Sequence, residues 1–303
     1  MSLLKTVVVI AGPTAVGKTR VAIEIGKLFS TEIISADSRQ CYKEMKIGVA
    51  RPEPEELAAV PHHFIASHSI EEQVNAAVFE RFALEKARGI FNKEDVVVVV
   101  GGTGLYIKTF CEGLDEIPEV PEQQRQEIIS NFKLNGLQWL QEQVKELDPE
   151  FFRAGETQNP QRLMRALEVA RATGRSILSY RKRVSATRDF RVIKIALEKP
   201  KDELHQRIER RVDVMMKVGL LEEVKALMPF QHLNALQTVG YKEVFEHLNG
   251  SISLEEAVAQ IKKHTRHYAK RQLTWFRKDP GFSWFDADDV EKIKEHLQDA
   301  LLK

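Results

Sequence analysis

The 303-residue sequence contains only two cysteines, Cys41 and Cys111. Two thiols cannot build a disulfide framework or a four-thiolate zinc site, so both classes of cysteine-stabilised protein are excluded. Long hydrophobic runs are also lacking. The apolar stretch near the N-terminus, Leu3 to Ala11, is followed by Pro13 and Lys18 before it reaches the length of a signal or membrane segment. We therefore expect a cytoplasmic protein with no membrane span.

Net charge is nearly absent, because 45 lysines and arginines face 44 aspartates and glutamates. The balance conceals local segregation. From Glu112 to Glu150 acids outnumber bases ten to three, whereas Arg162 to Arg191 has nine bases and two acids, and Lys262 to Lys278 has seven bases and no acid. Basic groups near phosphates release counterions, although a single charged run is usually a solvated helix face. Two basic segments that also carry aromatic residues favour contact with nucleic acid.

Apolar, β-branched runs alternate with helical patterns in the N-terminal part of the chain. A helix is predicted at Thr19 to Phe29, between the first two runs, and five consecutive valines are typical of a central parallel strand buried on both faces. This alternation predicts an α/β fold, a P-loop NTPase-like parallel sheet flanked by helices, with ligands at the carboxyl ends of the strands. The predicted strands are Lys5 to Ala11, Glu32 to Ala36, Val96 to Val100 and Arg191 to Leu197.

About ninety residues between the last two predicted strands contain no convincing strand pattern. Helical patterns cover Gln123 to Lys145 and Pro160 to Thr173, and the second is predicted to end at Gly174. We predict a helical insertion domain over residues 114–189, within a catalytic core made of residues 1–113 and 190–303. In the core, Asp202 is predicted to cap a helix with Leu204, Ile208, Val212, Met215 and Met216 on one face, and Ser253 with Glu256 forms a capping box for another.

The first predicted strand is followed by a segment that fits the pattern G-x-x-x-x-G-K-[ST] and opens a helix. Backbone amides in such a turn surround phosphate oxygens, and the helix N-terminus adds a positive dipole end. The lysine supplies a cation, and the final hydroxyl can ligate Mg²⁺. The segment therefore predicts a diphosphate or triphosphate ligand without deciding which. It consists of Gly12, Pro13, Thr14, Ala15, Val16, Gly17, Lys18 and Thr19.

A P-loop ATPase also needs an acid at the end of a hydrophobic strand to hold the metal. The valine strand instead runs into Gly101-Gly102-Thr103-Gly104, which contains no carboxylate. The acid stands after the second strand, in Asp37-Ser38-Arg39-Gln40. A carboxylate there can bind metal, accept a proton from a nucleophile or simply cap a turn, and the sequence leaves these three roles open.

Together these segments resemble the bacterial type of the tRNA dimethylallyltransferases, also called tRNA isopentenyltransferases. The matching motifs follow the family order and run from residue 12 to 277, so the resemblance is far more specific than any one motif. They are Gly12–Thr19, Asp37–Gln40 with Tyr42, Pro61-His62-His63, Gly101–Tyr106, Gln161-Arg162 with Arg165–Glu168, Gly240–Glu243, Ala269–Gln272 and Thr274–Phe276.

The sequence departs from the family pattern at two places. Val49 stands where the family usually has threonine, which puts in doubt any role for a hydroxyl there. Pro160 stands where the pair before the Gln-Arg motif usually ends in aspartate. Neither departure touches the phosphate-binding segment or Asp37. The cysteine pair of the zinc-finger extension in eukaryotic members is not found.

The resemblance implies transfer of a dimethylallyl group from dimethylallyl diphosphate to the exocyclic amine (N6) of the adenosine 3′ of the anticodon in tRNA. The products are isopentenyladenosine and diphosphate. Asp37 is expected to accept the amine proton and Thr103 to orient the base. Lys18, Mg²⁺ on Thr19, and either Arg207 or Arg211 are expected to stabilise the departing diphosphate.

Contact with the tRNA anticodon stem-loop is also implied by the resemblance, and a monomer is the default expectation. Arg162 and Arg165 can equally belong to a solvated helix face. The residues expected to contact tRNA are Asp37, Ser38, Arg39, Gln40, Thr103, Arg125, Gln161, Arg162, Leu163, Met164 and Arg165.

Two other functions fit parts of the sequence. A small-molecule or nucleoside kinase uses the same loop for ATP but leaves the basic segments unexplained. A non-catalytic RNA-binding regulator with a nucleotide switch has no need for Asp37. Other candidates are set aside, since the adjacent His62 and His63 rarely converge on a metal and Cys41 has no basic partner. His264 and His267 are expected to extend a basic helix face.

Overall fold

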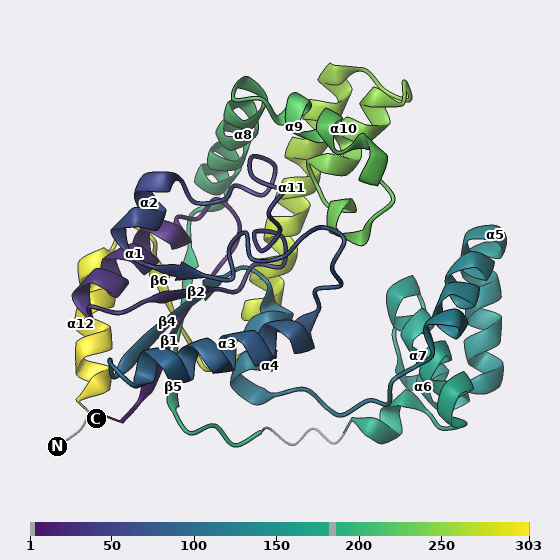
Figure 1. Ribbon diagram of the computed structural model, residues 1–303, viewed down its shortest axis with the longest axis horizontal. Helices are drawn as coiled ribbons and strands as arrows, with labels where there is room; N and C mark the ends of the chain where they lie inside the picture. Colours follow the sequence, from purple (N-terminus) through teal and green to yellow (C-terminus); the bar gives the residue numbers. More distant parts are fainter. Residues whose placement is uncertain (1–3, 182–185, 303) are drawn as a thin grey trace. The chain divides into compact units, whose positions relative to one another are not determined.

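The computed structural model describes residues 4–181 and 186–302 (Figure 1). The chain divides into two compact units. The first combines Met1–Glu112 with Thr187–Lys303 and is built on a β-sheet, whereas the second, Gly113–Ala186, is helical. The second unit covers nearly the same residues as the insertion that the sequence predicts.

The sheet of the first unit has six strands in the order β3-β2-β4-β1-β5-β6, and every neighbouring pair is parallel. The predicted α/β parallel sheet is therefore confirmed. Two strands escaped prediction: β3 has only two residues, and β6 is a short edge strand without a long apolar run. The strands are β1 (Thr6–Ala11), β2 (Ile33–Ser35), β3 (His62–His63), β4 (Val96–Gly101), β5 (Arg191–Glu198) and β6 (Phe282–Asp286).

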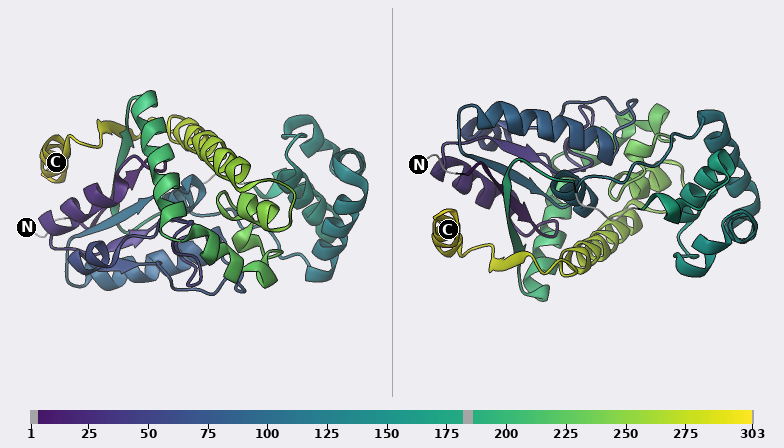
Figure 2. Two further views of the ribbon diagram at one scale, coloured as in Figure 1. Left: turned by 90° about the horizontal axis from the view of Figure 1, so that it is seen from above. Right: turned by 90° about the horizontal axis from the view of Figure 1, so that it is seen from below.

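Each face of the sheet is covered by helices. Val8 and Ile10 of β1 pack in one core, and Val7 and Val9 pack in the other, because successive side chains of a strand alternate between faces. Figure 2 shows α3 and α12 on opposite sides of the sheet. Burial on both faces explains the unbroken apolar strand sequences. The first core includes α1 (Lys18–Leu28), α8 (Lys201–Lys217) and α12 (Val290–Leu301); the second includes α3 (Ala76–Phe91), α4 (Gly104–Glu112), α9 (Leu220–Ala226) and α10 (Tyr241–Leu248).

Two predicted helix starts can be checked in the first unit. Ser253 caps α11 (Leu254–Phe276), and Glu256 completes the capping box as predicted. The prediction for α8 is wrong in detail: its N-cap is Pro200, and Asp202 lies inside the first turn without capping it. Its acidic side chain still suits the positive end of the helix dipole. The remaining helix of this unit is α2 (Pro54–Ala59), and 3₁₀ turns cover Met228–Phe230 and Asn234–Leu236.

The helical unit contains α5 (Glu122–Leu147), α6 (Pro149–Ala154), α7 (Pro160–Thr173) and a 3₁₀ turn at Ile177–Tyr180. The predicted helix over 123–145 is interrupted at Gly136, whose φ of 74° is not helical. Glycine reaches this conformation at little cost, so it allows the break. Asn159 caps α7, and Gly174 ends it with a left-handed conformation. A separate apolar core holds these helices together.

No helix within residues 4–181 and 186–302 is both long and apolar enough to cross a bilayer.

Candidate active site at the carboxyl end of the sheet

The loop between β1 and α1 has the form that the phosphate-binding motif predicts. Gly12 and Gly17 have φ values of 149° and 110°, which only glycine adopts readily. A Cβ atom on Gly12 would lie 2.8 Å from the Leu197 carbonyl oxygen, so the loop also approaches β5 closely. The Lys18 ammonium donates a hydrogen bond to the Pro13 carbonyl over 2.8 Å. The loop therefore folds around its own lysine.

Two positive charges at this loop, Lys18 of the loop itself and Arg211 of α8, are desolvated by burial, which disfavours a charged group. Burial lowers the pKa of Lys18 to about 8; the negative charge of Asp37 opposes this effect, and the positive charge of Arg211 adds to it. Burial also lowers the pKa of Arg211, whose Nη1 donates to the Thr14 hydroxyl over 3.2 Å. A bound anion would relieve the repulsion between these two cations, so the loop is suited to a phosphate group.

The sequence leaves Arg207 and Arg211 as equal candidates for a diphosphate contact, but their surroundings differ. The Arg207 guanidinium donates to the Val16 carbonyl over 3.1 Å, and its Nε lies 3.2 Å from a carboxylate oxygen of Glu203. Its charge is therefore already paired. Among the described residues Arg211 has no ion-pair partner, so it is the better placed of the two to bind an anion.

Asp37 and Thr103, the residues expected to act on the acceptor adenosine, lie beside this loop because of the strand order. Since β4 pairs with both β1 and β2, the turn after β4 is flanked by the ends of both neighbours. The Thr103 hydroxyl accepts a hydrogen bond from the Ser38 amide over 3.1 Å. The negative charge of Asp37 opposes the lowering of the Lys18 pKa and adds to the raising of the Tyr268 pKa, as expected for groups that lie close together. One end of the sheet therefore gathers the phosphate loop, Asp37 and Thr103.

Asp37 does cap a turn, which is one of the three roles that the sequence allows. Its Oδ1 accepts from the backbone amides of Arg39 and Gln40 over 2.9 and 3.2 Å. The other carboxylate oxygen makes no hydrogen bond to any residue that the structure describes. The capping contact therefore orients the carboxylate and leaves one oxygen available for chemistry.

Helix α11 packs tightly on the glycine turn after β4. A Cβ atom on Gly102 would lie 2.1 Å from Nε2 of Gln272, and one on Gly104 would lie 2.2 Å from the Trp275 ring. Gln272 is buried: its Oε1 accepts from the Thr14 amide and its Nε2 donates to the Gly102 carbonyl, each over 2.9 Å. Sequence reasoning assigned Gln272 no role, and only its place in a family motif drew attention to it.

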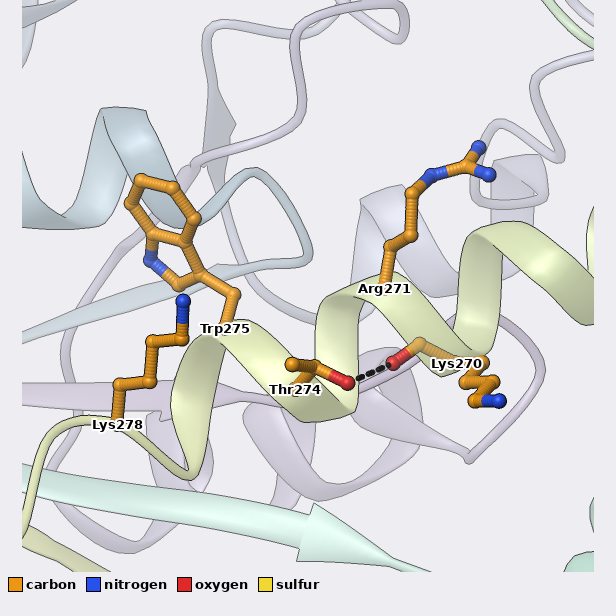
Figure 3. A pocket seen from close by; sticks show the side chains of 5 residues that line it. All are labelled: Lys270, Arg271, Thr274, Trp275 and Lys278. Carbon is orange, nitrogen blue, oxygen red and sulfur yellow. Dashed lines mark hydrogen bonds between the residues drawn. The ribbon is translucent and has the colours of Figure 1, made fainter. Parts of the chain in front are cut away.

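An exposed cationic surface lies on α11 around Trp275. Lys270, Arg271 and Lys278 line a shallow pocket with Thr274 and Trp275, as Figure 3 shows. These three cations have no ion-pair partner in the described part of the chain. In the same basic segment, Lys262, Arg266 and Arg277 are paired with Asp213, Glu209 and Glu198. The free charge of the segment is therefore concentrated near Trp275.

Tyr268 is a second side chain that sequence reasoning did not assign to the site. Its ring packs under the Arg271 guanidinium, 5.7 Å from the ring centre. Burial raises the pKa of its hydroxyl to about 12, the charge of Asp37 adds to this, and the charges of Arg39 and Arg271 oppose it. Tyr268 thus lies where the acceptor residues meet the basic side of α11.

Arg39 and Gln40 are occupied by contacts within the first unit. Arg39 donates to the carbonyls of Asn234 and Ala235, and Gln40 donates to those of Val49 and Ala50. As the structure stands, these two side chains shape the loops around the site rather than extend outward.

The arginines of the helical unit gather around one buried acid. Glu168 is 6% exposed, with Arg165 3.0 Å and Arg125 3.7 Å from its carboxylate oxygens. Arg162 is paired with Glu156, and Gln161 is exposed. Glu168 therefore brings together two arginines that lie 40 residues apart in the sequence.

Leu163 and Met164 need a correction as predicted tRNA contacts. Both are buried in the apolar core of the helical unit. In a helix, the residues between two exposed arginines face the opposite side. Their side chains stabilise α7 and are not available at the surface.

The histidines and cysteines offer no further site. The prediction that His264 extends a basic face is wrong, since its Nδ1 lies 2.6 Å from a carboxylate oxygen of Glu243. Cys41 is buried, and burial raises the pKa of its thiol to about 12, so it is no nucleophile. Within residues 4–181 and 186–302, no cluster of three metal-binding side chains is present.

Thr19 fits the Mg²⁺ ligand that the loop predicts. It lies in the first turn of α1 and is only partly buried. Its hydroxyl makes no hydrogen bond to the described residues. Mg²⁺ prefers oxygen ligands and is usually held by one or two protein groups together with substrate phosphates. A lone hydroxyl beside the amides of the loop suits that mode.

Comparison with known proteins agrees with this geometry. The family model described as IPP transferase matches residues 40–279. A tRNA dimethylallyltransferase from Christiangramia forsetii is 47% identical, and the alignment covers 93% of this chain and 94% of the relative. A tRNA dimethylallyltransferase from Phocaeicola vulgatus is 42% identical over 96% of this chain and 97% of the relative.

Solved structures share the fold. A full-length tRNA isopentenylpyrophosphate transferase from Bacillus halodurans is 34% identical, with a TM-score of 0.72 over 98% of this chain and 97% of that one. A eukaryotic dimethylallyltransferase, described as acting on tRNA, is 26% identical, with a TM-score of 0.78 over 93% of this chain and 74% of that one. The chain belongs to the IPP transferase family.

Proposed function

We propose that this protein transfers the dimethylallyl group of dimethylallyl diphosphate to N6 of the adenosine 3′ of the anticodon in tRNA, and releases diphosphate. The bond from the allylic carbon to the diphosphate oxygen breaks, and its electron pair leaves with the diphosphate. A bond from N6 to the same carbon forms, and one amine proton passes to the enzyme. We also propose that this reaction takes place in the cytoplasm, because tRNA is its proposed substrate.

The observation that carries the proposal is the composition of one end of the sheet. A phosphate loop, a carboxylate and a hydroxyl stand at the ends of three neighbouring strands, β1, β2 and β4. The acid follows β2 rather than β4. A kinase would need the loop to pass a phosphoryl group onward, whereas a prenyl transfer needs only a cradle for the leaving group and a base for the nucleophile.

The loop residues act on the leaving diphosphate. Negative charge accumulates there as the bond breaks, so preorganised donors aimed at it lower the barrier. The backbone amides of the loop, the Lys18 ammonium and the Arg211 guanidinium supply those donors. When bound, Mg²⁺ would add a further positive charge at the diphosphate, and Thr19 would be its protein ligand.

Asp37 is the group that we propose accepts the amine proton. The N6 lone pair is delocalised into the adenine ring, so the amine becomes a usable nucleophile only if its proton is removed as the bond forms. The turn cap on Oδ1 holds the carboxylate in place. We propose that the Thr103 hydroxyl, which lies beside Ser38, forms a hydrogen bond with the reacting adenine.

The basic surfaces are proposed to bind the tRNA and to offset the cost of moving the reacting base out of its stack. A base inside an anticodon loop must leave its stack to react, at a cost of a few kcal/mol. Phosphate contacts and stacking must offset that cost. The exposed Lys270, Arg271 and Trp275 of α11 and the arginines of α7 are proposed to provide them.

The decisive experiment mixes the enzyme, Mg²⁺, dimethylallyl diphosphate and an anticodon stem-loop with the target adenosine in place. Mass spectrometry of the RNA should show the gain of one five-carbon unit. Asp37→Asn keeps the shape of the side chain and should reduce transfer by about 10²- to 10⁴-fold, the usual contribution of a general base. RNA binding should survive that change. Absence of the five-carbon unit with the unmodified enzyme would refute the proposal.

A further inference from the structure

We infer that Gln272 is a positioning residue. It holds the part of the site that binds the prenyl donor and the part that binds the acceptor adenosine at a fixed separation. The inference rests on the proposed function, since those two parts are the diphosphate cradle and the adenine pocket. We assign Gln272 no contact with either proposed substrate. It acts through the two loops that it joins.

The two hydrogen bonds of Gln272 reach loops that are far apart in the chain. Its Oε1 accepts a hydrogen bond from the Thr14 amide, which is 258 residues away in the sequence. Its Nε2 donates a hydrogen bond to the Gly102 carbonyl, 170 residues away. Both bonds are 2.9 Å long, and the residue is 6% exposed. A buried primary amide with both ends satisfied holds its partners at a defined separation.

Further contacts extend this connection to the proposed base. Thr103, next to Gly102, donates its amide to the Ala36 carbonyl over 3.2 Å and accepts from the Ser38 amide. Asp37 lies between Ala36 and Ser38. The path from the cradle to Asp37 therefore runs from Thr14 through Gln272 to the glycine turn and on to β2.

The sheet alone does not fix this geometry. Gly12 and Gly102 each lie one residue past the paired ends of β1 and β4, so the pairing of these strands does not extend to the two loops that follow them. Glycine loops are also conformationally free. Gln272 adds a rigid support from α11, and the 2.1 Å approach at Gly102 shows that no side chain fits between the helix and the turn.

Only an amide suits this position. Leucine has a similar size but leaves the Thr14 amide and the Gly102 carbonyl without partners. A glutamate carboxylate can accept from Thr14, but its second oxygen would face the Gly102 carbonyl, and both are acceptors. A protonated glutamic acid has one acceptor and one donor and would reproduce the amide pattern. The charged groups around the phosphate loop are Lys18, Arg207, Arg211 and Asp37.

The test compares Gln272→Leu and Gln272→Glu with Gln260→Leu, a matched control at a partly exposed position of the same helix. A displacement near 1 Å can cost about 100-fold in rate. We expect kcat for transfer to fall about 10- to 100-fold in Gln272→Leu, while KM for the stem-loop stays near that of the control. The variant should still fold cooperatively, with a melting temperature below that of the control because two buried polar groups lose their partners. Hydrogen exchange at the Thr14 amide should become faster, a readout that does not depend on activity.

The pH profile separates positioning from a packing role. For Gln272→Glu, kcat relative to the unmodified enzyme should rise as the pH falls and the carboxylate becomes protonated. For Gln272→Leu the same ratio should not change with pH. The inference is overturned if Gln272→Leu retains kcat within about threefold, or if Gln272→Glu loses the same factor at every pH. Failure of the proposed function would look different, because the unmodified enzyme itself would then transfer no five-carbon unit.

Discussion

The two groups of candidate functional residues, one in each unit, are built in opposite ways. At the end of the sheet, Lys18 and Arg211 are close to one another and lack ion-pair partners among the described residues, so the site stores unpaired positive charge. In the helical unit, Arg125 and Arg165 share the buried Glu168, and Arg162 is paired with Glu156. The first arrangement calls for an anion, whereas the second presents arginines in fixed positions at little net charge.

This difference indicates a division of labour. Unpaired, desolvated cations bind a diphosphate strongly and stabilise charge that develops during the reaction. Arginines that are already paired with acids must exchange partners to bind a phosphate, so each is expected to contribute less affinity. We therefore expect changes at the sheet to affect chemistry and changes on α7 to affect RNA binding.

Among the basic residues compared, the largest effect is expected from Lys18→Ala. It removes a cation next to the developing charge, and loss of one such donor costs about 10²- to 10³-fold in kcat. Single-turnover transfer should fall by that factor, while the dissociation constant of the stem-loop, measured by fluorescence anisotropy, stays unchanged. A parallel loss of RNA affinity would contradict the division of labour.

Arg211→Gln and Arg207→Gln form a matched pair on one helix. Arg211 has no carboxylate partner, so its loss should reduce kcat/KM for the donor about 100-fold. Arg207 already serves Glu203 and the Val16 carbonyl, and its loss should cost about tenfold or less. Steady-state kinetics with varied donor concentration measures both. The reverse order would show that the pairing of Arg207 breaks when the donor binds.

A smaller effect is expected from Arg162→Ala combined with Arg165→Ala. RNA affinity should weaken about tenfold at moderate salt, and the slope of log affinity against log salt should decrease by about 0.7 to 0.9 for each lost phosphate contact. The rate at saturating RNA should not change. Lys133→Ala with Lys145→Ala removes two exposed charges from the same unit and serves as the control. An unchanged salt slope in the arginine variant would refute this RNA surface.

The smallest effect concerns pH. Because the pKa of Lys18 is lowered to about 8 in the free protein, the lysine loses its proton as the pH rises through that value. Only the protonated form attracts a diphosphate, so the dissociation constant of inorganic diphosphate should rise above about pH 8, by about tenfold per pH unit at most. Calorimetric titration measures this change. Lys18→Ala should remove the dependence, and a dependence that persists would assign it to another group.

Several features were predictable because they depend on short stretches of sequence. The phosphate loop follows a buried strand and opens a helix, and both contexts are legible from neighbouring residues. The caps at Ser253 and Asn159 and the glycine at 174 are local in the same sense, although only the first and last were predicted. The start of α8 shows that local prediction can miss by two residues, because the N-cap of that helix is Pro200 and not Asp202.

Other features depend on which segments the tertiary structure brings together. Glu203 lies four residues before Arg207 on one helix, so that ion pair is local, but the contacts of Arg207 with Val16 and of Arg211 with Thr14 join segments 191 and 197 residues apart. Leu163 and Met164 lie in a motif with exposed neighbours, yet the helix period turns them into the core. Gln272 is a polar residue in a basic helix, and its role follows from contacts with loops 170 and 258 residues away.

The sequence by itself determined the parallel sheet, the phosphate loop and the family resemblance, because hydrophobic period, glycine placement and motif order are written along the chain. The tertiary structure alone decided which arginine reaches the Thr14 hydroxyl and which side chain joins the cradle to the Thr103 turn. These depend on distances between segments that are remote in sequence, and strand order and helix packing set those distances.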